Sequence, residues 1–150
     1  MDLILWRHAE AADGVPDMAR QLTAKGEKQA EQVGTWLRAR LPAQTRVLVS
    51  PARRALQTAA ALTDEFETSV EVGLSTSVKR LLRAAGCPTA EGTVLVVGHQ
   101  PTLGQVAAFL LTGEAAEWDV KKGAVWWFEV VDNGGEPYAS VRAVIAPREA

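Results

Sequence analysis

Short apolar runs alternate along the chain with longer segments in which apolar residues recur at helical spacing. Residues 3–6, 47–49 and 93–97 are apolar or β-branched throughout, which is typical of strands buried on both faces of a sheet. Residues 70–72 form a weaker candidate strand. Strands that alternate with helices in this way predict an α/β fold with a largely parallel sheet.

Capping residues, prolines and glycines mark the ends of the predicted helices. Thr23 is placed to cap a first helix, which has Pro42 just beyond its end and one apolar face formed by Ala30, Val33, Leu37 and Leu41. Ser50 and Pro51 are typical of the N-cap and first position of a second helix, which should run to about Leu62. Two later helices are predicted to end at glycines: residues 78–85 before Gly86, and Pro101 to near Gly113.

The last part of the chain has the pattern of a β-hairpin. Residues 124–131 and 140–145 resemble two strands, and the connection between them contains Asp-Asn-Gly-Gly, which favours a turn. Residues 9–21 are rich in Ala, Asp, Gly and Pro and are expected to form a loop. No repeat or linker divides the sequence. We therefore predict a single domain over residues 1–150, a three-layer α/β/α sandwich with a mostly parallel central sheet and a late antiparallel element.

Composition narrows the classes of function. The net charge is -2 and the 16 Lys and Arg are spread along the chain, so neither a nucleic acid nor a membrane is expected as a partner. The one cysteine, Cys87, cannot form an internal disulfide and has no base beside it in sequence, which argues against a catalytic role. The first apolar run is too short for a signal peptide or a membrane span. A cytoplasmic location is the resulting expectation.

Three of the apolar runs are followed by residues that can bind or attack an anion. Arg7 and His8 follow the first run, the sequence Ser-Pro-Ala-Arg-Arg at 50–54 follows the second, and His99 follows the third. Ligands of open α/β sheets bind beyond the carboxyl ends of the strands, so these segments should meet in one crevice. Both histidines of the protein are among them.

Two adjacent arginines are predicted in the first turn of a helix, where the helix dipole disfavours cations. The cost there is roughly 0.3 to 1 kcal/mol for each charge, and helix N-termini are natural anion sites. The arrangement is understandable if Arg54 faces a bound anion while Arg53 points to solvent.

The three segments together resemble the motifs of the histidine phosphatase superfamily. Residues 5–11 resemble its Arg-His-Gly signature, residues 49–59 its second motif and residues 96–101 its third. Chain length and motif order are most similar to the small SixA-type phosphohistidine phosphatases. The resemblance implies a phosphatase that forms a covalent phosphohistidine on His8, with phosphate bound by Arg7, Arg54 and His99.

The chemistry of these residue types agrees with that implication. The two arginines can give bidentate donors to phosphoryl oxygens and stay charged at any working pH. His8 can attack only with an unprotonated ring nitrogen, and nearby arginines should lower its pKa. A backbone carbonyl that accepts from Nδ1 would leave Nε2 free to attack. His99 would donate a hydrogen bond to the phosphoryl group from a second side.

The sequence departs from the family pattern at two places. Ala9 stands where the signature has glycine after the nucleophile, and residues 72–80 lack the carboxylate that protonates the leaving group in many relatives. The nearest earlier carboxylate, Glu71, is expected within a strand, and Glu10 and Asp13 are the candidate substitutes. An imidazole leaves with little help from an acid. The missing carboxylate therefore favours phosphohistidine on a protein as the substrate, for example on a histidine-containing phosphotransfer protein.

Two alternatives stay open on sequence alone. The chain could hydrolyse small phosphomonoesters with an acid not yet identified, or it could bind phosphate or phosphoproteins with negligible turnover. Lys121 and Lys122 could border the anion site, although a solvated turn fits them as well. Two histidines and scattered carboxylates lack metal-ligand spacing, so neither a metal nor another cofactor is expected.

Overall fold

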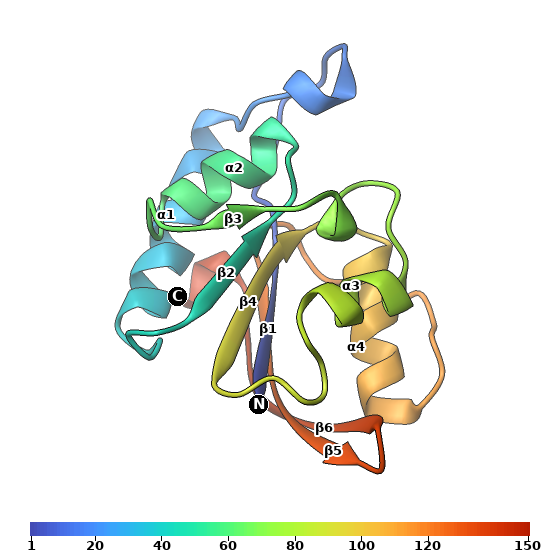
Figure 1. Ribbon diagram of the computed structural model, residues 1–150. Helices are drawn as coiled ribbons and strands as arrows, with labels where there is room; N and C mark the ends of the chain where they lie inside the picture. Colours follow the sequence, from blue (N-terminus) through green and yellow to red (C-terminus); the bar gives the residue numbers. More distant parts are fainter.

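A six-stranded mixed sheet forms the centre of the protein, as seen in a computed structural model that describes residues 1–150 (Figure 1). The strand order is β3-β2-β4-β1-β5-β6. The strands are β1 (Asp2–Arg7), β2 (Arg46–Val49), β3 (Glu67–Thr68), β4 (Thr93–Gly98), β5 (Val125–Asn133) and β6 (Glu136–Ile145).

Strand directions confirm the predicted sheet. β1 pairs in parallel with β4, and β2 pairs in parallel with both β4 and β3. β5 pairs antiparallel with β1, and β6 pairs antiparallel with β5, which is the late antiparallel element. The hairpin is longer than its pattern indicated, because both strands continue to the turn at Gly134 and Gly135.

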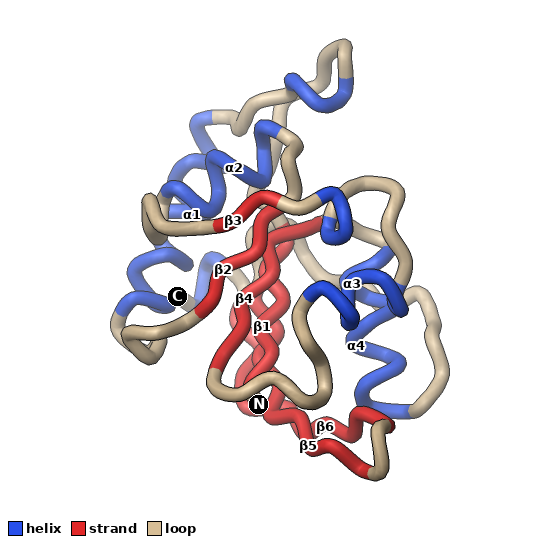
Figure 2. Tube along the Cα trace, in the orientation of Figure 1, coloured by secondary structure: helices blue, strands red, loops and turns tan.

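Helices cover both faces of this sheet and complete the three layers (Figure 2). The helices α1 (Ala24–Arg38) and α2 (Arg53–Ala60) lie on one face, and α3 (Val78–Ala84) and α4 (Thr102–Thr112) lie on the other (Figure 1). Each face has its own apolar core. In β1, Ile4 and Trp6 belong to one core while Leu3 and Leu5 belong to the other, so the all-apolar run indeed lies between two layers.

The predicted cap at the start of α1 and the predicted glycine at the end of α4 are confirmed. The hydroxyl of Thr23 accepts a hydrogen bond from the backbone N–H of Gly26 at 2.9 Å and caps α1. α4 ends at Gly113, whose φ of 85° is left-handed. Leu41 lies beyond the end of α1 but still packs against the core beneath that helix.

The prediction that Ser50 caps α2 is wrong. The N-cap residue is Ala52, and no side chain caps this helix. The Ser50 hydroxyl instead accepts from the backbone N–H of Ala52, two residues on, which forms a serine turn rather than a helix cap. The helix therefore starts at Arg53, and it ends at Ala60 rather than near Leu62.

The prediction of a strand over residues 70–72 is also wrong. These residues form a 3-10 helix, η2, and the edge strand β3 lies just before it. The hydroxyl of Ser69 accepts from the backbone N–H of Glu71 at 3.1 Å and so closes a tight turn that a strand would not permit. Two further 3-10 helices are η1 (Asp17–Ala19), within the predicted loop, and η3 (Pro147–Glu149).

None of the helices is both long and apolar enough to cross a membrane. The single-domain assignment of residues 1–150 stays a prediction.

Candidate active site

The four predicted site residues lie together at the carboxyl ends of the parallel strands. Arg7 is the last residue of β1 and is paired in register with Gly98, the last residue of β4. The next residues, His8 and His99, are therefore neighbours, and their ring centroids are 5.1 Å apart. Arg54, in the first turn of α2, reaches the same place, with its Nε 3.4 Å from Nε2 of His8.

Three of these four polar side chains are buried, and Arg7 is half-buried. His8 is 8% exposed, and Arg54 and His99 are each 4% exposed. Arg53, by contrast, is exposed on the same helical turn. The two arginines therefore differ in placement as the sequence suggested.

The geometry around His8 leaves one of its nitrogens available for attack. Nδ1 lies 2.8 Å from the carbonyl oxygen of Ala9, and because a carbonyl only accepts, Nδ1 carries the proton. Nε2 then keeps its lone pair, which accepts a long hydrogen bond of 3.4 Å from Nε–H of Arg54. The pKa of His8 is lowered to about 4, chiefly by burial and then by the charges of Arg54 and Arg7. The sequence indicated the direction of this shift, but its larger cause is burial.

His99 is held from the side opposite the site. Its Nε2 lies 2.7 Å from the hydroxyl of Ser50, at the end of β2. Its Nδ1 is buried and has no hydrogen-bond partner. Burial, followed by the effects of His8 and Arg54, lowers the pKa of His99 to about 3, so the ring is neutral at neutral pH.

Arg7 also has one donor engaged by the protein and one without a partner. Nη1 donates to the carbonyl of Val120 at 2.9 Å, which anchors the guanidinium against the segment that precedes β5. Nε is buried and has no hydrogen-bond partner. Arg7 and His99 are the only residues with such an unpartnered buried side-chain atom. An oxyanion with several acceptor oxygens is the kind of ligand that satisfies such donors.

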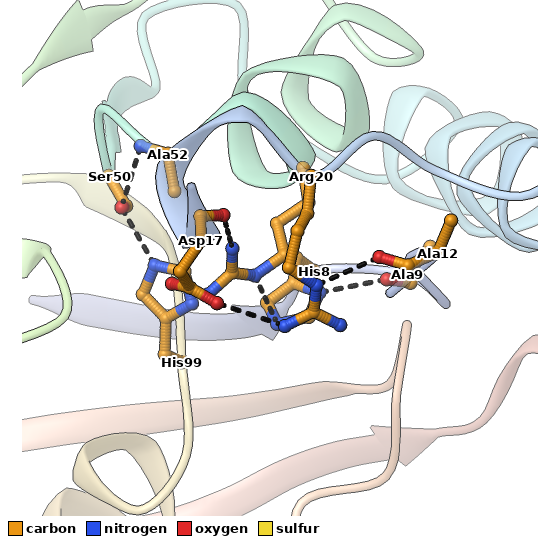
Figure 3. A network of polar contacts seen from close by, with 9 residues as sticks. His8, Ala9, Ala12, Asp17, Arg20, Ser50, Ala52 and His99 are labelled. Carbon is orange, nitrogen blue, oxygen red and sulfur yellow. Dashed lines mark hydrogen bonds and ion pairs between the residues drawn. The ribbon is translucent and has the colours of Figure 1, made fainter. Parts of the chain in front are cut away.

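Two residues of the loop after β1 join the site, and sequence reasoning missed them. Asp17 accepts from Arg54 twice, through its backbone carbonyl at 2.9 Å and through its carboxylate at 3.1 Å. Arg20 donates to the same carboxylate at 3.1 Å and to the carbonyl of Ala12 at 2.8 Å (Figure 3). Hydrogen bonds from the two arginines hold the pKa of Asp17 below its usual range, so it is ionised at neutral pH. No local pattern marks a contact between residues 37 positions apart.

The candidate acids lie in different surroundings. The carboxylate of Glu10 accepts from the hydroxyl of Thr23 at 2.8 Å and so belongs to the capping of α1. Asp13 is exposed on the loop. Glu71 is on η2 rather than on a strand and pairs with Arg80 at 2.8 Å on the surface, which lowers the pKa of this carboxyl group.

The segment that carries Lys121 and Lys122 borders the site, because the carbonyl of Val120 accepts from Arg7 at 2.9 Å and the backbone N–H of Gly123 donates to the carbonyl of His8 at 3.1 Å. Lys121 and Lys122 are exposed, and Lys121 pairs with Asp119 at 2.7 Å, as in a solvated turn. Burial raises the pKa of the half-buried Cys87 thiol to about 11, so it is protonated at neutral pH. No three His, Cys, Asp or Glu side chains are grouped to hold a metal ion.

Comparison with known proteins agrees with this fold. A sequence model of the histidine phosphatase superfamily (branch 1) matches residues 3–76. Phosphohistidine phosphatase SixA of Escherichia coli is 32% identical over 127 residues, which cover 76% of each protein. An uncharacterized protein of Mycobacterium tuberculosis is 39% identical over 111 residues, covering 69% of this chain and 68% of that protein. The structure of the protein histidine phosphatase SixA complexed with tungstate has a TM-score of 0.78 and 26% identity, over 99% of this chain and 98% of that one.

A three-layer α/β fold with paired histidines and arginines beyond its parallel strands defines a phosphoryl-transfer class of protein. The chain belongs to the histidine phosphatase superfamily, with SixA proteins among its relatives in both sequence and structure. The family, the fold class and the enzyme class, a phosphatase, are thereby confirmed.

Proposed function

We propose that this protein hydrolyses phosphohistidine on another protein, through a covalent phosphoryl intermediate on Nε2 of His8. One observation carries the proposal: a buried, unprotonated Nε2 lies beside the buried guanidinium of Arg54. Unpartnered donors of Arg7 and His99 belong to the same group. A nucleophile surrounded by fixed donors is what in-line phosphoryl transfer requires.

In the first step Nε2 of His8 attacks phosphorus, and the bond from phosphorus to the leaving nitrogen breaks. The arginines and His99 stabilise the charge on the three equatorial oxygens, and the departing imidazole takes up a proton from solvent. In the second step water attacks phosphorus, the bond to Nε2 breaks, and inorganic phosphate leaves. The Ala9 carbonyl holds the proton on Nδ1 during both steps.

The substrate class follows from the absence of a well-placed acid. Glu10 is engaged in the cap of α1, and Asp17 is kept ionised by two arginines. An imidazole is a far better leaving group than an alkoxide when no acid protonates it. The Escherichia coli relative SixA is a phosphohistidine phosphatase, which supports the same substrate.

The short connection between the motifs supports a protein substrate. Only 44 residues separate Arg54 from His99, and they include β3, η2, α3 and β4. That length leaves no room for the large insertion that covers the site of mutase-like relatives, so we expect the phosphoryl pocket to open to solvent. A phosphorylated side chain on a folded protein, such as a histidine-containing phosphotransfer protein, can enter an open site and gain its affinity from the surrounding surface.

The test is a substrate panel combined with trapping of the intermediate. Turnover of a phosphohistidine-bearing protein should exceed that of an alkyl phosphate and of small phosphomonoesters. Because phosphohistidine is labile to acid, the labelled enzyme is quenched in alkali and mapped by peptides. Label should lie on His8, and His8→Ala should show no turnover above background while the control Arg53→Ala keeps it.

Other outcomes would select the alternatives. Label on His99 would reverse the assigned roles. A small ester turned over with micromolar KM, and better than any phosphohistidine protein, would establish the phosphomonoesterase. Phosphate binding with no turnover of any substrate would identify a binding module. Activity should survive a chelator, since arginines can neutralise the phosphoryl oxygens, and restoration by added zinc or magnesium would contradict this. The cytoplasmic location stays a prediction.

A further inference from the structure

The hydroxyl of Ser50 is fully buried, and a single acceptor is within reach of its hydrogen. Ser50 directly follows β2, and its backbone N–H donates to the carbonyl of Val97 at 3.0 Å. Two polar atoms lie within hydrogen-bond distance of its Oγ: the backbone nitrogen of Ala52 at 3.2 Å and Nε2 of His99 at 2.7 Å. Figure 3 shows this chain of contacts from the helix start to the imidazole.

The two contacts have opposite directions. The backbone N–H of Ala52 only donates, so it uses a lone pair of Oγ. The hydrogen of the hydroxyl then has one acceptor within reach, Nε2 of His99. If Nε2 carried the proton instead, both the buried hydroxyl hydrogen and the Nδ1 lone pair would have no partner, whereas the other tautomer leaves only the Nδ1–H without one. Ser50 therefore donates to an unprotonated Nε2.

This direction fixes the tautomer of His99. A neutral imidazole with a bare Nε2 carries its proton on Nδ1. That Nδ1 is the buried atom without a partner, and in Figure 3 it lies on the side of the ring away from Ser50, toward Asp17. His8 also has its proton on Nδ1, but there the Ala9 carbonyl accepts it. The same tautomer thus gives His8 an unprotonated Nε2 and gives His99 an Nδ1–H without a partner.

We propose that Ser50 is a positioning residue that selects the Nδ1–H tautomer of His99 and thereby makes this neutral ring a hydrogen-bond donor to the phosphoryl group. The inference rests on the proposed function for the identity of the acceptor. The tautomer itself follows from the contacts of Ser50 alone. Opposite ring nitrogens of two adjacent histidines then face the phosphoryl group, with Nε2 of His8 as the attacking atom and Nδ1–H of His99 as the donor.

The chain offers a closely matched control for Ser50. Ser69 forms the same kind of turn, in which its hydroxyl accepts from the backbone N–H two residues on, at 3.1 Å, but its hydroxyl has no histidine partner. Ser50→Ala and Ser69→Ala therefore remove the same turn hydrogen bond, and only the first changes His99. Ser50→Thr keeps the hydroxyl and serves as the rescue variant.

The tautomer can be measured directly, because the protein has two histidines. Long-range nitrogen–proton NMR spectra of protein labelled with ¹⁵N at histidine separate the two rings, and His99→Gln assigns them. We expect Nδ1–H for His99 in the wild type and a mixture containing Nε2–H in Ser50→Ala, with the His8 signals unchanged. The rate of phosphoenzyme formation should fall about tenfold or more in Ser50→Ala. Ser50→Thr and Ser69→Ala should keep both the tautomer and the rate.

Two results would overturn the proposal. Nε2–H on His99 in the wild type, or an unchanged tautomer in Ser50→Ala, would refute the role of the serine without touching the proposed phosphatase. A tautomer change in folded Ser50→Ala that leaves phosphoenzyme formation at the wild-type rate would refute the donor role of Nδ1. Thermal unfolding of each variant shows that the comparison is made on folded protein. Failure of the proposed function itself would appear separately, as an absence of label on His8 in the wild type.

Discussion

The two buried histidines should make the protein lose stability in mild acid. In the unfolded chain both rings titrate near pH 6.5, but in the folded protein their pKa values are about 4 and about 3. Both shifts are downward, so the unfolded state binds more protons than the folded state between these values and pH 6.5. The free energy of unfolding is therefore unaffected well above pH 6.5, and it falls as the pH drops through that value.

The size of the loss follows from the two shifts. Between pH 7 and pH 5 each ring should lower the free energy of unfolding by about 2 kcal/mol, or about 4 kcal/mol for both. Carboxylates titrate at lower pH than these histidines do in the unfolded chain. Asp17 has a lowered pKa, so its contribution is present above about pH 4 and is lost only as the pH falls further. The interval from pH 7 to pH 5 thus reports on the histidines.

Urea denaturation followed by tryptophan fluorescence measures this loss, since the chain has five tryptophans. The wild type should lose about 4 kcal/mol of unfolding free energy between pH 7 and pH 5, and His8→Gln or His99→Gln about half as much. The double variant should be nearly flat over the same range. Equal pH dependence in the wild type and the double variant would refute the reasoning, because the histidines would then not be the groups that titrate.

Three further predictions concern the site and its support. The kcat/KM of the wild type should hold from neutral pH to about pH 5 and fall near pH 4, because His8 attacks only when unprotonated; a limb near pH 6.5 in folded protein would contradict its lowered pKa. Arg54→Ala should lose on the order of 3 kcal/mol of transition-state stabilisation, roughly a hundredfold in kcat/KM, whereas Arg53→Ala should change kcat/KM less than about twofold. Equal defects would contradict the placement of the two arginines. Gly26→Ala should lower the free energy of unfolding in urea by about 1 to 3 kcal/mol or more, because an added Cβ would lie 2.0 Å from the carbonyl oxygen of Glu10. Unchanged stability would mean that this backbone contact can relax.

Much of the fold is predictable because its signals are local or periodic. β1 and β4 lie between two layers, so their apolar runs are unbroken and easy to recognise. Thr23 caps α1 through a contact only three residues long. The order of the three motifs likewise predicts the site, since parallel strands bring their carboxyl ends to one edge of the sheet.

The errors arise where one local pattern permits two structures. Ser50 followed by proline fits a helix cap and a serine turn equally well, and the contact of its hydroxyl with His99, 49 residues away, has no local signal. An apolar-polar-apolar triplet such as residues 70–72 fits a short strand or a tight turn, and the hydroxyl of Ser69 decides between them. The Asp17–Arg54 contact has no local signal, because it depends on how the loop after β1 folds back over α2.

In the resting site, the Asp17 carboxylate competes with other anions for Arg54. A phosphoryl group that bonds to Nη2 of Arg54 must displace the carboxylate, and so must inorganic phosphate that binds there once it is formed. The Asp17 side chain is 52% exposed, so the pair is worth at most about 1 kcal/mol, which weakens anion binding by no more than about fivefold. Losing this ion pair weakens the binding of substrate and of product alike. Saturation by substrate is therefore slightly harder to reach, but the cleaved phosphate is returned to solvent faster, with the loop's own carboxylate taking its place.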